Sequence, residues 1–354
     1  MNPVLAKKTV VENTEKKNER KQKKRGAVMW GFLYAGAFLV SFVVSAVVKM
    51  TYNPLGDKYT VAWNDSVGRV YRDLAYGDGE ANKFDLYVPA DKSKENYGLV
   101  VYLHAGGFTS GDKSGDASML QWLCSRGYVA AGINYTLSDQ EHPDANVYTQ
   151  SVEIRESIPS VIDEAEKLGY HINEMAVSGG SAGHCLAMLY AYRDAVTSPV
   201  PVKMVFGAVG PSCFYLEDWI NLGADPEDPV AVDPDMDYSQ MAGLFSVMAG
   251  KKITADMFGT GAYLEEMKDI SAAMWINEDS VPTVCAYGSW DKLQAFGASR
   301  RLAAALEEHH VPHEYIVFEH SGHGLQNDTN RFKEYMEKVL EYLDTYMPAD
   351  GKSF

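Results

Sequence analysis

The most constraining feature of the chain is a short stretch in which an apolar strand runs directly into a serine flanked by glycines. Residues 175–184 read Met-Ala-Val-Ser-Gly-Gly-Ser-Ala-Gly-His, and helix-forming residues follow. The order Gly-x-Ser-x-Gly is typical of a nucleophile elbow, a sharp strand-to-helix turn that exposes the serine side chain. The turn is so tight that a Cβ at Gly179 or Gly183 would collide with the neighbouring strand or helix. We therefore expect Ser181 on strained backbone at the start of a helix.

Two polar loops offer the partners that such a serine needs. A serine hydroxyl is a weak nucleophile at neutral pH, so it requires a base in hydrogen-bond reach, and that base requires an orienting carboxylate. In an open α/β sheet these groups gather at the carboxyl ends of the strands. Asp291 follows the strand expected over residues 281–287, and His323 follows the one expected over residues 314–318. Because the chain order Ser, Asp, His is the one that this architecture uses, we predict Ser181, Asp291 and His323 as the catalytic set.

Other roles for these residues remain open from the sequence. An aspartate after a strand is often a helix N-cap, and a helix is expected after Asp291. His320 competes with His323 for the role of base, but the glycines on both sides of His323 would let its backbone approach the elbow, which favours His323. His184 follows the serine by three residues, so we expect it to line the substrate pocket or to be structural.

A glycine-rich loop and the residue after the serine are candidates for an oxyanion hole, which requires backbone amides aimed at one point. Ala182 supplies one amide as the residue after the nucleophile. Gly106 and Gly107 follow the apolar strand expected over residues 99–103, and glycine lets a loop turn its amides inward without an obstructing side chain. We predict that Ala182, Gly106 and Gly107 form the oxyanion hole and that His104 braces the loop.

Strands and helices alternate along residues 71–350, which predicts an α/β domain with a mostly parallel central sheet covered by helices on both faces. The domain opens with a β-hairpin around Gly77-Asp78-Gly79. Besides the elbow strand, the strands expected after the hairpin lie at residues 99–103, 128–135, 202–209, 281–287 and 314–318. The expected helices lie at residues 117–126, 148–168, 185–192, 295–308 and 330–346. Pro159 predicts a kink or a restart in the second of these helices.

Residues 212–279 interrupt the alternation and are acidic around residues 225–237. The segment also contains Met236, Met241, Met248, Met257, Met267 and Met274. Its place between two sheet strands favours a helical cap over the active site, with flexible methionine side chains lining an acyl or alcohol pocket. A surface excursion with its own small core is the alternative.

A basic run and an apolar run stand at the N-terminus. Residues 1–25 contain nine Lys or Arg and three Glu, whereas residues 26–48 carry no charge and are rich in Phe, Val, Leu and Ala. A helix over residues 26–48, rising about 1.5 Å per residue, would cover the ~30 Å hydrocarbon core of a bilayer. A core helix would show a polar face, and a cleaved signal peptide would have a shorter apolar core. We expect a single-pass signal-anchor, with the basic tail in the cytoplasm and the catalytic domain, after a linker at residues 49–70, outside the cell membrane.

The body of the chain is acidic, since the net charge is −16 despite the basic tail. An acidic surface argues against nucleic acid as a partner. The four cysteines are widely spaced and include no C-x-x-C pair, which gives no signal for a metal site. Free thiols are favoured over a disulfide framework at Cys124, Cys185, Cys213 and Cys285, although one bridge stays possible in an oxidising compartment. We expect neither a metal nor another cofactor.

The elbow, the oxyanion loop and the acid and base loops together resemble those of a known protein family. The chain from about residue 74 to residue 346 resembles the α/β-hydrolase superfamily, and more closely its esterase/lipase branch related to hormone-sensitive lipase and to bacterial feruloyl- and acetyl-esterase-like carboxylesterases. The matching motifs are His104-Ala105-Gly106-Gly107-Phe108, Gly111-Asp112-Lys113, Gly179-Gly180-Ser181-Ala182-Gly183, Gly288-Ser289-Trp290-Asp291 and Gly322-His323-Gly324. The resemblance implies an α/β-hydrolase fold with a cap insertion.

The chain departs from the family pattern at three positions. The family usually has Gly where Ala105 stands, commonly an acidic residue where Gly180 stands, and Gly where His184 stands. Within the same motifs, Phe108 and Trp290 are expected, together with His184, to contact the substrate.

The sequence thus predicts a membrane-anchored serine carboxylic-ester hydrolase that acts through an acyl-enzyme on small or medium acyl esters. A serine peptidase of the prolyl-oligopeptidase type shares the triad and its order, and acidic residues in the cap that grip an N-terminal amine would favour it. A catalytically silent binding module on the same fold is a second alternative.

Overall fold

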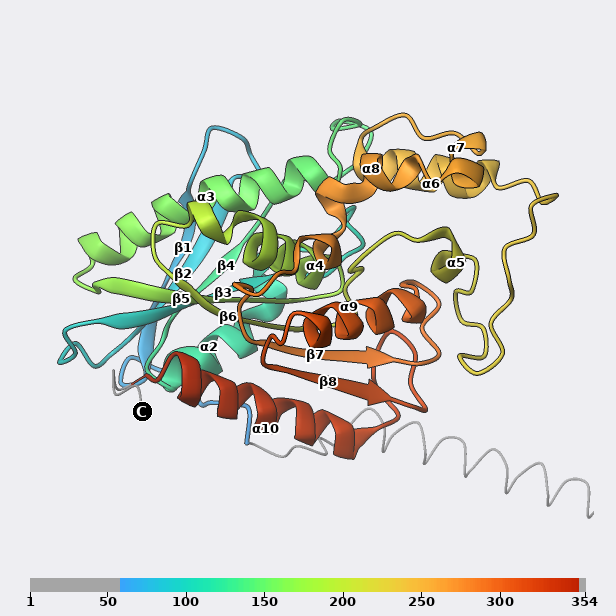
Figure 1. Cartoon of the computed structure of the whole chain (residues 1–354). Helices are drawn as coiled ribbons and strands as arrows, with labels where there is room; N and C mark the ends of the chain where they lie inside the picture. The colour runs from blue at the N-terminus through green and yellow to red at the C-terminus, as the bar shows by residue number, and fades with distance from the viewer. Residues whose placement is uncertain (1–57, 350–354) are drawn as a thin grey trace, which may run out of the picture. The chain divides into compact units, whose positions relative to one another are not determined.

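The computed structural model describes residues 58–349, which fold around one eight-stranded sheet (Figure 1). The strand order is β1-β2-β4-β3-β5-β6-β7-β8. Strand β2 is antiparallel to both of its neighbours, and all other neighbouring pairs are parallel. The strands are β1 (Gly68–Ala75), β2 (Lys83–Pro89), β3 (Tyr97–Leu103), β4 (Val129–Ile133), β5 (Ile172–Gly180), β6 (Val202–Ala208), β7 (Thr283–Gly288) and β8 (His313–Phe318). The predicted mostly parallel sheet and its opening hairpin are confirmed.

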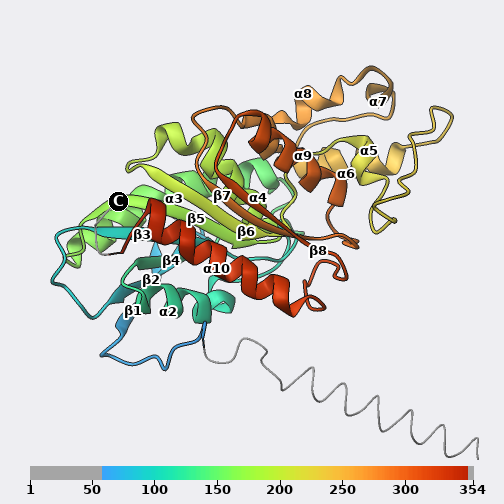
Figure 2. The same ribbon diagram turned by 60° about the horizontal axis from the view of Figure 1, so that its bottom comes forward.

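Helices cover both faces of the sheet, as predicted. Helices α2 (Ala117–Ser125) and α10 (Thr329–Tyr346) lie on one face (Figure 2). Helices α3 (Val147–Lys167), α4 (Ala182–Leu189) and α9 (Phe296–Glu308) lie on the other. Continuous apolar strands fit between these layers because both of their faces are covered: every residue of β7 is buried, and five of the seven in β3 are.

Helix α3 begins with a reciprocal cap in which the Asn146 side chain accepts from the Thr149 amide and the Thr149 hydroxyl accepts from the Asn146 amide. Of the kink or restart expected at Pro159, the restart does not occur, since one helix runs through that position. Pro159 is exposed, and water can reach the carbonyl that a proline leaves unpaired on that side of a helix.

Between β6 and β7 the chain forms a helical excursion at the right of Figure 1. It contains the helices α5 (Leu216–Trp219), α6 (Ser239–Ala249), α7 (Asp256–Thr260) and α8 (Tyr263–Met267). The aromatic side chains of the excursion centre on the ring of Phe245, which is fully buried and belongs to the same hydrophobic core as the sheet, not to a separate small core. That ring contacts the rings of Phe214, Trp219, Phe258 and Tyr263.

The predicted membrane helix at residues 26–48, like the basic tail before it, lies outside the described residues. Among the helices of residues 58–349, none combines the length and the apolar character that a membrane span requires. All four cysteines are buried and free, as the sequence favoured.

A buried ion cluster fixes the opening hairpin to the loop after β3. The Lys113 ammonium lies 2.7 Å from a carboxylate oxygen of Asp73 and 3.3 Å from one of Asp85. The other Asp85 oxygen lies 3.2 Å from the Arg72 guanidinium. The side chains of Lys113 and Asp85 are only 6% and 1% exposed, so their buried charges are compensated by each other and by the more exposed Asp73 and Arg72.

Replacing Lys113 by Met should therefore destabilise the fold by about 2 kcal/mol, because the buried Asp85 carboxylate would keep only the half-exposed Arg72 guanidinium as its counter-charge. Urea unfolding followed by far-UV circular dichroism measures this change. Lys58→Met is the matched control: its partner Glu337 lies at the surface, so the change should stay below about 1 kcal/mol. Equal losses in the two variants would contradict the assignment.

Candidate active site

The structure brings Ser181, His323 and Asp291 together in one hydrogen-bonded chain. The Ser181 Oγ lies 2.8 Å from Nε2 of His323, and Nδ1 of His323 lies 2.7 Å from a carboxylate oxygen of Asp291. Ser181 stands between β5 and α4, Asp291 follows β7, and His323 follows β8. All three side chains therefore meet at the carboxyl edge of the parallel strands, where the sequence placed them.

The backbone of Ser181 has φ 52° and ψ −119°, a conformation that L-residues rarely adopt. The neighbouring glycines explain how it is held. A Cβ on Gly183 would lie 1.9 Å from the carbonyl oxygen of Leu103, and one on Gly179 would lie 2.5 Å from the backbone of Gly183. The Ser181 amide also donates to the Ala208 carbonyl at 2.8 Å. Helix α4 thus begins as close to β3 as two backbones allow.

Asp291 is fully buried, and both of its carboxylate oxygens are used. One oxygen accepts from the amides of Leu293 and Gln294, at 2.8 and 3.1 Å. The other accepts from His323. Asp291 is not the N-cap of α9, since Ala295 occupies that position. The carboxylate is therefore fixed by its own loop and free to orient one imidazole.

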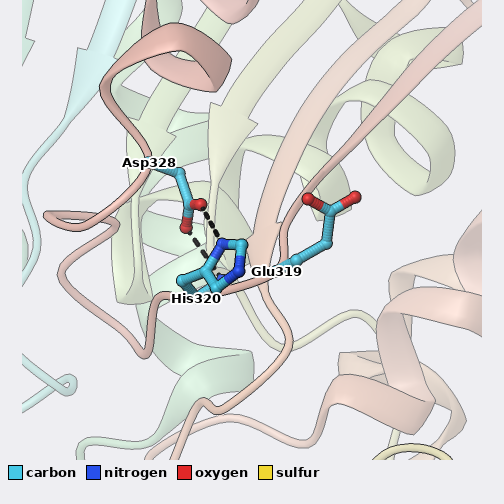
Figure 3. Close-up of side chains that lie close together, drawn as sticks. All are labelled: Glu319, His320 and Asp328. Carbon is cyan, nitrogen blue, oxygen red and sulfur yellow. Dashed lines mark hydrogen bonds and ion pairs between the residues drawn. The ribbon is translucent and has the colours of Figure 1, made fainter.

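His320, the competing base, lies apart from this chain. Its side chain is 77% exposed, and its Nδ1 lies 2.8 Å from Asp328. Figure 3 shows this pair beside Glu319. Asp328 also accepts from the His320 amide and from the Ser321 hydroxyl. The polar atoms of Glu319, His320 and Asp328 lie within 4.8 Å of one another, but Glu319 is ion-paired with Arg331 at 3.2 Å. This cluster braces the loop that carries His323.

The predicted oxyanion loop has the backbone that inward-facing amides require. Gly106 and Gly107 have φ 137° and 60°, and a Cβ on Gly106 would lie 1.8 Å from the Ser110 carbonyl oxygen. Both glycines, with Ala182 and Ser181, line the same cavity. Within residues 58–349, no hydrogen-bond partner occupies the amides of Gly107 and Ala182. These amides are therefore available to an oxyanion.

Two buried side chains hold this loop in place. His104 stacks on the ring of Tyr135 at 4.3 Å, and its Nδ1 lies 2.8 Å from the Ala105 carbonyl. Burial lowers the pKa of His104, which keeps the ring neutral in the stack. Gln150 of α3 donates to the carbonyls of Phe108 and Thr136, at 2.9 and 2.8 Å.

A cavity of about 720 Å³ opens in front of Ser181 and His323. Its wall is mostly apolar and includes Phe108, Val209, Pro211, Trp219, Leu222, Leu244, Val247, Met248 and Leu293. Helix α6 contributes three of these side chains, so the excursion between β6 and β7 forms part of the wall, as expected of a cap. Of the six cap methionines, Met248 alone lines the cavity. Met267 is buried in the cap and Met236 is exposed.

Phe108 lies in the cavity wall as expected, but His184 and Trp290 do not, which corrects the expectation that Trp290 contacts substrate and favours the structural role over the pocket role for His184. His184 is fully buried beside β6, and its Nδ1 accepts from the Gly210 amide at 3.2 Å. Burial lowers its pKa to about 3, so it stays neutral. The Trp290 indole donates to the Glu319 carbonyl at 3.0 Å, which ties the loop of Asp291 to that of His323.

Sequence reasoning missed Gln150 and Gln294. Gln150 lies four and eight residues before Ile154 and Ile158, on the apolar stripe of α3. A polar residue inside an apolar stripe is a signal that a buried hydrogen bond exists, although it does not name the partner. Gln294 also lines the cavity and is buried. No pattern in the sequence distinguishes it from an ordinary loop residue.

The comparison with protein families matches residues 84–306 to the BD-FAE family, over more than half of the chain and across the elbow and the acid loop. The chain belongs to the BD-FAE family. The predicted membership of the α/β-hydrolase superfamily, in its esterase branch, is thereby confirmed.

Curated relatives of this BD-FAE protein match over a shorter span. A kynurenine formamidase of Salmo salar is 32% identical over 121 residues, which is 34% of this chain and 38% of that protein. A probable isoprenylcysteine alpha-carbonyl methylesterase of Oryza sativa subsp. japonica is 28% identical over 151 residues, 40% of this chain and 35% of that protein. The chain thus matches less than half the length of either relative.

Solved structures of esterases share the fold of this BD-FAE protein. A truncated carbohydrate esterase from gut microbiota has a TM-score of 0.60 at 18% identity, and the match covers 79% of this chain and 98% of that one. Esterase B from Lactobacillus rhamnosis has a TM-score of 0.57 at 18% identity, covering 87% of this chain and 95% of that one. At this identity the likeness establishes the fold.

The elbow geometry predicts that alanine is costly for stability at one glycine of the motif and nearly neutral at another. Gly183→Ala should cost about 2 kcal/mol of folding free energy, because its Cβ would collide with backbone that cannot move. Gly180→Ala should change stability by less than about 0.5 kcal/mol, since no atom lies within 4 Å of its Cβ position. Urea unfolding of both variants measures the difference. Equal stabilities would show that α4 does not approach β3 as described.

Proposed function

We propose that this BD-FAE protein is a serine carboxylic-ester hydrolase that acts through an acyl-enzyme on small or medium acyl esters. The observation that carries the proposal is the continuous hydrogen-bonded chain from Asp291 through His323 to Ser181, which ends at an apolar cavity. A hydroxyl at the end of such a chain has a base to take its proton and a carboxylate to stabilise the imidazolium that results.

In the first half of the reaction, His323 takes the proton from Ser181 as the Ser181 oxygen attacks the ester carbonyl. Asp291 holds the imidazole in the tautomer that leaves Nε2 free to accept this proton. The amides of Ala182, Gly106 and Gly107 stabilise the negative oxygen of the tetrahedral intermediate. His323 then gives its proton to the leaving alcohol, and the acyl group remains on Ser181.

In the second half, His323 takes a proton from water as the water oxygen attacks the acyl-enzyme. The tetrahedral intermediate forms again against the same amides, and its collapse returns the proton to Ser181 and releases the carboxylic acid. The chain's own residues supply every proton transfer, so the proposal needs no metal or cofactor.

The wall of the cavity favours an ester over a peptide as the substrate. A peptidase that grips an N-terminal amine needs a carboxylate near the nucleophile, and no Asp or Glu occurs among the described residues that line the cavity. The acidic run of the cap lies elsewhere, with Asp225, Glu227 and Asp233 outside the cavity wall. A catalytically silent binding module would not need an intact triad. The hydrogen-bonded chain of Asp291, His323 and Ser181 is complete, which favours an enzyme over such a module.

Replacing Ser181 by Ala should lower kcat for p-nitrophenyl acetate and butyrate by at least about 10⁴-fold, because the nucleophile is lost while the oxyanion amides remain. Release of p-nitrophenolate, compared among acetate, butyrate and octanoate esters, measures the loss and sizes the acyl pocket. An aryl formamide belongs in the same panel, because a matched relative is named a formamidase.

The control is the stability of Ser181→Ala, whose melting temperature should not fall because Ala182 and Gly183 still form the turn. If the folded full-length protein in detergent hydrolysed none of these compounds, the proposal would be wrong.

We further propose that residues 26–48 anchor the enzyme in the cell membrane, with residues 1–25 in the cytoplasm and the catalytic domain outside. The uncharged run and the nine basic residues before it support this orientation. The substrate would then be an ester that reaches the outer side of that membrane.

A double substitution tests the anchor. Leu33→Lys with Leu39→Lys places two charges in the apolar run, each costing about 3 kcal/mol at the centre of a bilayer, so the protein should leave the membrane fraction. Alkaline carbonate extraction followed by immunoblotting measures the partition. Thr51→Lys with Asn53→Lys adds the same charges to the linker and should leave the protein in the membrane pellet. Wild-type protein in the supernatant would refute the anchor.

A further inference from the structure

The cavity wall beside Asp291 holds a buried carboxamide without a partner. Gln294 follows Asp291 by three residues, and its backbone amide donates to the Asp291 carboxylate at 3.1 Å. The residue lines the cavity and is 1% exposed. Within the described part of the chain, neither Nε2 nor Oε1 of Gln294 has a hydrogen-bond partner.

The other buried carboxamide at this site behaves differently. Gln150 is also fully buried, but its Nε2 donates to the carbonyl of Phe108 in the oxyanion loop and to that of Thr136 after β4, and among the described residues only its Oε1 lacks a partner. Such pairing is the rule for buried amides, because an unpaired donor or acceptor loses its bonds to water without replacement. Gln294 breaks the rule at both atoms, and it does so in the wall of the substrate cavity. A substrate group is therefore the natural partner for it.

The surroundings define the chemistry of that group. Most side chains of the wall are apolar, so a group bound there gives up its hydration. Asn146 also lines the cavity, but its side chain already caps α3. Lys292 and Thr109 are exposed and Ser138 is half-buried, so among the described residues of the wall Gln294 is the buried neutral side chain with both a donor and an acceptor unpaired. A neutral group that both donates and accepts, a hydroxyl or an amide, complements it.

We propose that Gln294 is a specificity-determining residue that selects esters bearing a hydroxyl or amide a few bonds from the ester carbonyl over plain alkyl esters. The inference rests on the proposed ester hydrolysis. An alkyl ester fills the cavity and leaves the Gln294 carboxamide unpaired, whereas a hydroxylated or amide-bearing ester pairs with it. A site that bonds a polar substrate group discriminates strongly against the analogue that lacks it.

The test compares wild type with Gln294→Leu, which removes donor and acceptor at similar volume and keeps the backbone bond to Asp291. Two matched substrate pairs locate the polar group. One pair differs on the alcohol side, 2-hydroxyethyl butyrate against propyl butyrate, and the other on the acyl side, the p-nitrophenyl esters of N-acetylglycine and pentanoic acid. Acid release in a pH-stat gives kcat/KM for each ester. Gln121→Leu, the same substitution in α2 and away from the cavity, is the control.

We expect wild type and the control to prefer the polar member of at least one pair, and Gln294→Leu to lower that preference at least tenfold, mainly through KM. Gln294→Leu should also melt at a higher temperature, because it removes a buried unpaired amide. An unchanged preference, or equal losses on both members of each pair, would overturn the proposal. A lower melting temperature would also overturn it, since it would show that the protein itself pairs the carboxamide.

Binding to inactive protein separates this inference from the proposed function. Calorimetric titration of the four esters into Ser181→Ala, with and without Gln294→Leu, measures the binding affinity for the polar and the plain member of each pair without turnover. If wild type hydrolysed no ester but the polar esters bound more tightly only when Gln294 is present, the proposed function would fail and the role of Gln294 would stand. If the wild-type protein hydrolysed the esters but Gln294→Leu changed neither turnover nor binding, the proposed function would stand and the role of Gln294 would fail.

Discussion

The close approach of α4 to β3 is the contact on which the rest of the site depends. Gly183 lies against the Leu103 carbonyl so tightly that a single methyl group would not fit. This approach forces Ser181 into its strained backbone conformation and points the start of α4 at the cavity. Leu103 is also the last residue of β3, after which the oxyanion loop begins. One backbone contact therefore sets the proposed nucleophile and the proposed oxyanion amides relative to each other.

Asp291 and His323, the proposed acid and base, depend on a second set of contacts that do not involve the elbow. Both the Ser289 hydroxyl and the Trp290 indole donate to the Glu319 carbonyl, at 3.0 Å each. These bonds tie the loop after β7 to the loop after β8, and Asp328 braces the second loop from the other side. Asp291 and His323 thus sit on loops whose geometry is fixed before any substrate enters, which is the preorganisation that electrostatic catalysis requires.

How far the sequence predicts this site depends on how strongly chemistry restricts each position. Ser181, Asp291 and His323 were predictable because a triad demands three residue types, in a given order, at three strand ends. Substrate contacts were less predictable, because they depend on which way a side chain turns. His184 turns toward β6, where Gly207 and Gly210 leave room for its ring, and Trp290 turns toward a carbonyl of a distant loop. Gln294 can be identified as a candidate substrate contact only from the structure, which shows that its carboxamide is buried and unpaired in the cavity wall.

The aromatic core of the cap has a consequence for how such an enzyme can diverge. Phe245 anchors α6 among the rings of the cap, whereas Leu244, Val247 and Met248, on another side of the same helix, line the cavity. Leu244 and Val247 are 40% and 66% exposed, so few folding contacts depend on them. Natural variation can therefore change the residues that meet the substrate while the cap keeps its anchor and the catalytic sheet keeps its shape. New substrate preferences can arise by single substitutions along one helical face, without first weakening the protein.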